Sequence, residues 1–254
     1  MTSRFSDLKD RVVVVTGGSR GIGAATARRF GENRARVVVS GRDQAAIDDV
    51  VAAIKWEGGK AIGVAADVTS ADQLTELRRR TESEFGPADV LIAFAGGSGE
   101  PIPTADLTED RWRAAVDSNL TATYLTVTAF LGGMTDRKQG AIVTMASAAA
   151  RQPARSNIAY AAAKAGVIAF TRHLATEVGP CGVRVNCIAP SAIVNDRMRA
   201  AMSEGAMDAL GQSFPLRRVG QPADVAEAAL YLSSASAGWV TGVVLDIAGG
   251  KIMV

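Results

Sequence analysis

Short runs of apolar, mostly β-branched residues alternate along the chain with longer segments in which apolar positions recur every three or four residues. A continuous apolar run predicts a strand buried on both faces, and the longer period predicts an amphipathic helix. The predicted strands are Arg11–Thr16, Arg36–Ser40, Ala61–Ala66, Ala88–Ala95, Ala141–Ala146, Val183–Ile188 and Val243–Ile247. The predicted helices are Gly21–Gly31, Asp43–Trp56, Ala71–Phe85, Thr108–Met134, Ile158–Val178 and Pro222–Leu232.

Repeated strand–helix units with right-handed crossovers build a parallel sheet with helices on both faces. No Pro/Ser-rich run or charge block marks a linker, so residues 1–254 are expected to form a single α/β domain around a doubly wound sheet of about seven strands. Ligands of such folds bind at the edge where the strands end. The residues expected to follow the first six strands, at that edge, are Gly17, Ser40, Asp67, Ala95, Ser147 and Pro190.

A glycine-rich turn follows the first predicted strand. The four valines Val12–Val15 lead to Gly17-Gly18, and a helical pattern starts near Gly21. Backbone N–H groups and the positive end of a helix meet at such a turn, which therefore suits a pyrophosphate. Gly17, Gly21 and Gly23 allow the backbone to approach a ligand and the helix to pack on the sheet.

Tyr160 and Lys164 stand four residues apart in the helix predicted for Ile158–Val178. Side chains with this spacing share one face of a helix. An ammonium close to a phenol favours the phenolate, so we expect Lys164 to lower the pKa of Tyr160 from its usual value near 10. The pair is then a candidate for proton transfer near neutral pH.

These features occur together in a known family. Thr16–Gly23 resembles the Thr-Gly-x-x-x-Gly-x-Gly motif of the short-chain dehydrogenase/reductase family, and Tyr160-x-x-x-Lys164 resembles its catalytic pair. Ser147 and Asn119 fall where that family has a catalytic serine and a helix asparagine. The resemblance runs from about residue 10 to the C-terminus. It is strongest to the 3-oxoacyl-carrier-protein reductase-like members, whose C-terminal sequences are similar to residues 239–242 and 249–254.

The resemblance implies a Rossmann-type fold and an oxidoreductase that transfers a hydride between a nicotinamide and a carbonyl or secondary alcohol. Tyr160 would act as general acid or base, and Lys164 would lower its pKa and bind the nicotinamide ribose. Ser147 would bind the substrate oxygen. Asn119 would hold, through its backbone carbonyl, a water connected to Lys164.

The cofactor preference depends on the end of the second strand. An acid there suits the ribose of NAD, whereas an arginine accepts the 2′-phosphate of NADP. Arg42 follows this strand, Arg20 lies in the glycine turn, and Asp43 is the acid that could favour NAD instead. The sequence therefore predicts NADP(H) over NAD(H). The predicted cofactor-binding residues are Gly17, Ser19, Arg20, Gly21, Ile22, Gly23, Ser40, Arg42, Asp67, Val68, Ala95, Gly96, Tyr160, Lys164, Pro190, Ile193 and Asn195.

The chain departs from the family pattern at several positions. Ala93-Phe94 replaces two asparagines that usually connect neighbouring strands, so Phe94 is expected to pack in the interior. Ser191 replaces a glycine, and Asn195 stands in for a threonine that usually meets the carboxamide. Residues 191–214 are expected to form a substrate lid, with residues 98–104 as the opposite wall.

Composition adds few constraints. Hydrophobic residues make up 48% of the chain and charged residues 21%, which is typical of a globular protein. A net charge of +2 gives no reason to expect nucleic acid or a membrane surface as a partner. One histidine and two cysteines do not suggest a metal site or a disulfide framework. With no apolar leader, a cytoplasmic location is expected.

The leading hypothesis is an NADPH-dependent ketone reductase acting on a 3-oxoacyl-type substrate. Two alternatives remain open: an alcohol or sugar dehydrogenase that runs in the oxidative direction, and an NADP-binding regulatory protein without turnover. Apolar residues on several faces of the helices at 108–134 and 158–178 predict a homotetramer, or a dimer built on the same surfaces.

Overall fold

The computed structural model describes residues 5–97 and 99–253. Within these residues the strands form one parallel sheet in the order β3-β2-β1-β4-β5-β6-β7. The doubly wound sheet predicted from the sequence is therefore confirmed. The strands are β1 Val12–Thr16, β2 Arg36–Gly41, β3 Lys60–Ala65, β4 Val90–Ala93, β5 Gly140–Met145, β6 Val183–Pro190 and β7 Val244–Ile247.

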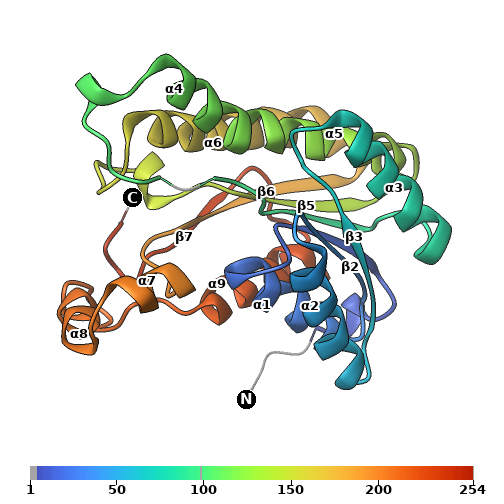
Figure 1. Ribbon diagram of the computed structural model, residues 1–254. Coiled ribbons are helices and arrows are strands. Elements are labelled where there is room, and N and C mark those ends of the chain that lie inside the picture. Colours follow the sequence, from blue (N-terminus) through green and yellow to red (C-terminus); the bar gives the residue numbers. More distant parts are fainter. Residues whose placement is uncertain (1–4, 98, 254) are drawn as a thin grey trace.

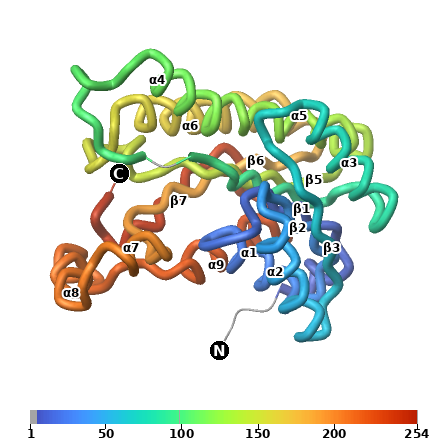
Figure 2. Tube along the Cα trace, viewed as in Figure 1, coloured from blue at the N-terminus to red at the C-terminus, as the bar shows by residue number. Residues whose placement is uncertain are grey.

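Helices cover both faces of this sheet. They are α1 Gly21–Glu32, α2 Gln44–Trp56, α3 Ala71–Phe85, α4 Glu109–Val116, α5 Ala122–Asp136, α6 Ile158–Val178, α7 Asp196–Ala201, α8 Glu204–Gln212 and α9 Pro222–Ser233. The helices α1, α2 and α9 lie on one face, and α3 to α6 lie on the other (Figure 1). The short helices α7 and α8 lie beside the sheet, on the side of β7 and the C-terminus (Figure 2).

Most predicted boundaries agree with the structure, and α3 and α6 agree to the residue. The continuous helix predicted over Thr108–Met134 is wrong in one respect, because a π-helical turn at Asp117–Thr121 separates α4 from α5. Such a turn is a local change of backbone hydrogen bonding inside a helical segment, and no residue type marks it in the sequence. Ser40 and Pro190 were expected to follow strands, but they lie inside β2 and β6.

The strand order reverses between β1 and β4, where the chain crosses from one half of the sheet to the other. In open α/β sheets a ligand crevice forms at this point, outside the carboxyl ends of the strands. Gly17 follows β1, Ala95 lies just beyond β4, and Ser147 lies just beyond β5. The topology therefore brings these three residues to one edge.

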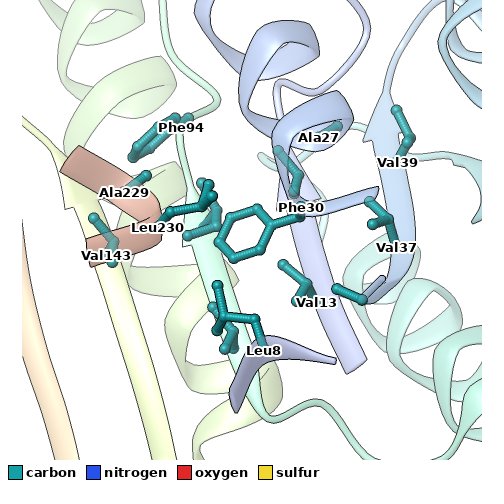
Figure 3. Close-up of a cluster of buried hydrophobic side chains, with 14 of the residues drawn as sticks. Leu8, Val13, Ala27, Phe30, Val37, Val39, Phe94, Val143, Ala229 and Leu230 are labelled. Carbon is teal, nitrogen blue, oxygen red and sulfur yellow. The ribbon is translucent and has the colours of Figure 1, made fainter. Parts of the chain in front are cut away.

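The core between the sheet and helices α1 and α9 is built around Phe30. Its ring is fully buried and lies between Val13 and Leu230 (Figure 3). Phe94 belongs to the same cluster and is 8% exposed, which confirms that it packs in the interior. Thr16 Oγ1 donates a long hydrogen bond to the Ile92 carbonyl, at 3.4 Å, and accepts one from the Ala95 N–H, at 3.5 Å, so it links β1 to β4.

None of the helices in the described part of the chain combines the length and hydrophobicity that a bilayer-spanning segment needs. Across residues 5–97 and 99–253, three or more His, Cys, Asp or Glu side chains nowhere gather in a metal-binding arrangement. The expectations of a cytoplasmic location and of no metal site stay predictions.

Replacing Phe30 by alanine should lower the free energy of unfolding by about 3–5 kcal/mol, because it leaves a cavity at the centre of this core. Urea denaturation measures the change. Trp56→Ala is the control, since Trp56 is 92% exposed and its loss should cost no more than about 0.5 kcal/mol. Equal costs for the two variants would contradict the packing described for α1.

Candidate active site

A tight glycine turn joins β1 to α1. Gly17 has a φ of +67°, and a Cβ at this position would lie 2.9 Å from the backbone of Ala95. A Cβ on Gly23 would lie 2.0 Å from the Gly17 carbonyl oxygen. Only glycine satisfies both requirements, which explains how the helix start comes so close to the sheet.

The first turn of α1 has no side-chain cap, because its N-cap residue, Arg20, makes no capping hydrogen bond. Asp43, Ser70 and Asn157 do cap α2, α3 and α6. The first N–H groups of α1 are therefore left to an anion, as expected where a helix begins at a glycine turn. This part of the structure fits the pyrophosphate of a dinucleotide.

Ser147, Tyr160 and Lys164 meet at the edge of the sheet beyond β5. Ser147 begins the 3₁₀ turn Ala148–Ala150, where its Oγ accepts a hydrogen bond from the Ala149 N–H at 3.2 Å. Helix α6 carries Tyr160 and Lys164 on one face, and Lys164 Nζ lies 5.7 Å from the centroid of the Tyr160 ring. Ser147 and Tyr160 line the same cavity.

Lys164 is buried, with only 4% of its surface exposed. Its Nζ donates a hydrogen bond to the Met145 carbonyl at 2.9 Å. Burial disfavours the ammonium and lowers the pKa of Lys164 to about 8, while the nearby Cys187 acts weakly in the opposite direction. The side chain is therefore able to lose and regain a proton at mildly alkaline pH.

The expected effect of Lys164 on Tyr160 is not what the structure shows. Burial raises the pKa of the Tyr160 phenol above its usual value, and the neighbouring Ser147 offsets only part of this effect. The physical reason is that Nζ points to the Met145 carbonyl and faces the ring of Tyr160. In this state the phenol is held in its protonated form.

Asn119 lies in the π-helical turn and is fully buried. Its side-chain N–H donates to the Ala115 carbonyl at 2.9 Å, whereas Oδ1 has no partner among the described residues. A Cβ on Gly96 would lie 2.8 Å from this Oδ1 and 3.3 Å from Lys164 Nζ. Asn119, Lys164 and the chain after β4 therefore surround one small volume.

The other end of the crevice carries the residues predicted to bind the nucleotide ribose. Arg20 pairs with Asp43 at 2.5 Å, and Asp43 also accepts from the Ala46 N–H as the cap of α2. Arg42 is exposed and makes no hydrogen bond or ion pair with the residues that the structure describes. Ser40 is buried, and its Oγ has no partner in the same range.

Asp67 follows β3 and accepts hydrogen bonds from the N–H and the hydroxyl of Thr69, at 2.9 Å and 2.7 Å. These bonds lower the pKa of Asp67 and keep it ionised. Val68 beside it packs against the core on the α3 side of the sheet. Both residues follow the end of β3, at the carboxyl edge of the sheet where a nucleotide was expected.

Two of the four buried side-chain polar atoms that lack a partner in residues 5–97 and 99–253 belong to predicted site residues: Ser40 Oγ and Asn119 Oδ1. They lie at opposite ends of the crevice. Together with the uncapped start of α1, they fit a dinucleotide laid across the ends of β2, β1 and β4.

One cavity of about 1050 Å³ opens at this edge. Of the predicted site residues, those that line it are Gly17, Arg20, Ile22, Gly23, Ser147, Tyr160, Pro190, Ile193 and Asn195. Those that lie outside its lining are Ser19, Gly21, Ser40, Arg42, Asp67, Val68, Ala95, Gly96, Asn119 and Lys164. The expected lid, residues 191–214, contains α7 and α8 and contributes Met198, Met202, Leu210 and Phe214 to the wall.

Asn157 was not assigned a role from the sequence. It is 5% exposed, its Oδ1 accepts from the Tyr160 N–H at 2.8 Å, and its Nδ2 donates to the Glu100 carbonyl at 2.8 Å. This amide connects the start of α6 to the opposite wall of the cavity. Residue 98 of that wall lies outside the described residues. An asparagine before an apolar helical run was a usable N-cap signal.

Comparisons with known proteins agree with this geometry. Residues 17–251 match the family model described as Enoyl-(Acyl carrier protein) reductase. The chain is 37% identical to a 3-oxoacyl-[acyl-carrier-protein] reductase of Synechocystis, over 97% of this chain and 98% of the relative. It is 32% identical to glucose 1-dehydrogenase 2 of Bacillus subtilis, over 98% and 97%.

Among solved structures, the chain is similar to a 3-oxoacyl-[acyl-carrier protein] reductase from Brucella melitensis with bound NAD. The TM-score is 0.90 at 34% identity, and the match covers 98% of this chain and 94% of the other. The names of these relatives are those of reductases and a dehydrogenase, and one of the solved structures contains NAD. From the sheet, the glycine turn and these matches together, the chain belongs to the short-chain dehydrogenase/reductase family of oxidoreductases.

Proposed function

We propose that this protein is an NADP(H)-dependent reductase that converts a ketone, of the 3-oxoacyl type or similar, to a secondary alcohol. The observation that carries the proposal is the meeting of Ser147, Tyr160 and Lys164 at one edge, beside the uncapped start of α1. Binding a nucleotide alone does not require Tyr160. Because the chain is an oxidoreductase, we set aside the non-catalytic alternative.

In this proposal Tyr160 donates its phenolic proton to the carbonyl oxygen, and Ser147 Oγ donates a hydrogen bond to the same oxygen. A bound nicotinamide supplies the hydride to the carbonyl carbon. Lys164 binds the ribose and restores the proton of Tyr160. The Asn119 carbonyl, which accepts from Thr123 Oγ1 at 2.7 Å, would hold a water on that path.

The protonation state of Tyr160 supports the reductive direction. A general acid must carry its proton at working pH, and burial raises the pKa of this phenol. Oxidation needs the phenolate, so it should become faster as the pH rises. An alcohol or sugar dehydrogenase remains the second candidate, and the similarity to glucose 1-dehydrogenase 2 favours it.

The preference for NADP(H) is supported by the charges at the end of β2. Asp43 is engaged by Arg20 and by the cap of α2, so it is poorly placed to accept from a ribose hydroxyl. Arg42 is exposed beside it. A guanidinium in this position suits a 2′-phosphate, which it can hold with two parallel hydrogen bonds.

We also propose that residues 1–254 form one domain, with residues 191–214 as the lid, and that the protein is a cytoplasmic homotetramer or a dimer built on the same helices. Tyr124 on α5 is 51% exposed and Ile158 on α6 is 49% exposed, which supports an interface there. Val127 on α5 and Leu174 on α6 are apolar but cannot contribute to this interface, because both are buried against the sheet.

Replacing Tyr160 by phenylalanine should preserve folding and NADPH binding but reduce turnover about 10²–10⁴-fold, because only the proton donor is lost. A panel of ketones and alcohols, followed by NADPH absorbance, measures this. Tyr231→Phe is the control, since Tyr231 is on the exposed side of α9. A Tyr160→Phe variant that kept a third of its activity would exclude this role.

Arg42→Ala should weaken the binding of NADPH about tenfold or more and leave NADH nearly unchanged, because a charge-assisted contact to the 2′-phosphate is lost. Fluorescence titration of both cofactors measures the ratio. Arg28→Ala, an exposed arginine on α1, controls for the change in net charge. Equal losses for both cofactors, or a wild type that prefers NADH, would refute the assignment.

Lys164→Met should raise the free energy of unfolding at pH 7 by up to about 3 kcal/mol, because it removes a buried charge. The gain should fade between pH 8 and 10.5, where the folded Lys164 is already neutral but the unfolded one still binds a proton. Urea denaturation across this range tests both statements. A gain that did not depend on pH would contradict the burial of an ammonium.

A further inference from the structure

The cavity extends well beyond Tyr160. The far part of the cavity is the portion lined by the segment Gln152–Ser156, by the lid and by Lys251 of the C-terminal segment. Four apolar side chains of the lid face this part: Met198, Met202, Leu210 and Phe214. An apolar chamber of this kind binds the body of a substrate, whereas a few polar groups at its limits fix the orientation.

The charges that line the cavity all have one sign. Among the described residues, the lining contains the cations Arg20, Arg155 and Lys251 and no aspartate or glutamate. Arg20 belongs to the nucleotide end, where it pairs with Asp43. Arg155 and Lys251 belong to the far part, and neither forms an ion pair within residues 5–97 and 99–253.

Two acidic groups near the cavity, Glu100 and Asp246, are paired with arginines. Glu100 pairs with Arg197 of α7, which links the lid to the opposite wall. Asp246 forms a two-pronged ion pair with Arg151, with both side chains about 15% exposed or less. Arg155 and Lys251 are both exposed to solvent, and the charged side chains that line the far part within the described residues are these two cations.

Lys251 is held in place by its surroundings. Its Nζ lies 4.9 Å from the centroid of the Phe214 ring, a cation–π contact with a lid residue that lines the cavity. The next residue, Ile252, is buried and packs with Ala148, which directly follows Ser147. Lys251 is exposed, but the packing of Ile252 fixes the adjacent backbone and the contact with Phe214 places the ammonium at the cavity wall.

We propose that Lys251, assisted by Arg155, binds an oxyanion at the end of the substrate remote from the reacting carbonyl. The substrate class is then an apolar oxo compound that carries a carboxylate or a phosphate. This inference rests on the proposed function only for the position of the reacting substrate carbonyl, beside Ser147 and Tyr160. The anion site itself depends on the charges and the packing of the far part.

Calorimetry tests the site without turnover. Hexanoate and its neutral match hexanamide are titrated into the protein saturated with NADP⁺, which occupies the end that contains Arg20. We expect hexanoate to bind about tenfold more tightly than hexanamide, and Lys251→Gln to remove this difference. Lys55→Gln, the same change on the exposed side of α2, should preserve it. Equal binding of the two probes, no binding of either, or a preference that survives Lys251→Gln would overturn the proposal.

Matched substrates then distinguish the two sources of the anion. One pair is 5-oxohexanoate and 5-oxohexanamide, and the other is 3-oxobutanoyl pantetheine with and without its 4′-phosphate. A lower KM for 5-oxohexanoate than for its amide identifies a carboxylate, and a lower KM for the phosphorylated pantetheine identifies a phosphate. In either case the difference should be lost in Lys251→Gln. No preference in either pair would overturn the role of Lys251 in substrate selection. A lack of turnover with all four compounds would contradict ketone reduction, while the site is still judged by the calorimetry.

Discussion

The rest of the active site depends on one buried ammonium group, that of Lys164. Lys164 is held beneath the carboxyl edge of the sheet by the Met145 carbonyl, and no carboxylate in the described chain lies within ion-pair distance of it. Burying a charge without a counter-ion is costly, and a protein usually avoids it by a shift in pKa. The low pKa of Lys164 is that shift, and it places a labile proton next to Tyr160.

The groups around Lys164 come from separate elements, and the sheet fixes their relative positions. Strand β5 provides the carbonyl that binds Nζ and leads directly to Ser147. The π-helical turn provides Asn119, and the cap residue Asn157 fixes the first turn of α6 and thereby the backbone of Tyr160. The side chains proposed to take part in the reaction are therefore positioned by strands and helices. The cavity walls proposed to contact the substrate come from loops, the lid and the C-terminal segment.

Features of the fold that depend on local residue patterns could be predicted from the sequence. The valine run of β1, the glycine turn and the full length of α6 could be predicted because apolar periodicity and turn chemistry determine them. The π-helical turn at Asn119 could not be predicted, because it is a local change in backbone hydrogen bonding that no residue type marks. Ser40 was misplaced by a single residue, since strand ends have no strong signal.

The pKa of Tyr160 was expected to fall below its usual value, but burial raises it. The prediction was wrong because residue spacing tells which side chains share a helix face but not where Nζ of Lys164 points. Lys164 turns to Met145, so the burial of the phenol decides the sign. The position of Lys251 was equally hidden. It depends on a long-range contact with Phe214 and on Ile252 packing beside Ala148, which no local pattern encodes.

The central claim is that burial keeps Tyr160 protonated in the free protein, and that a bound cofactor prepares it for proton transfer. The chain has three tyrosines, so ¹³C NMR of Cζ-labelled tyrosine can follow each phenol through a pH titration, with Tyr160→Phe to assign the signal. The account predicts a pKa of Tyr160 above its usual value of about 10 in the free protein, and a lower one with NADP⁺, whose nicotinamide ring is positively charged. A pKa below 10 in the free protein, or one that NADP⁺ does not change, would contradict it.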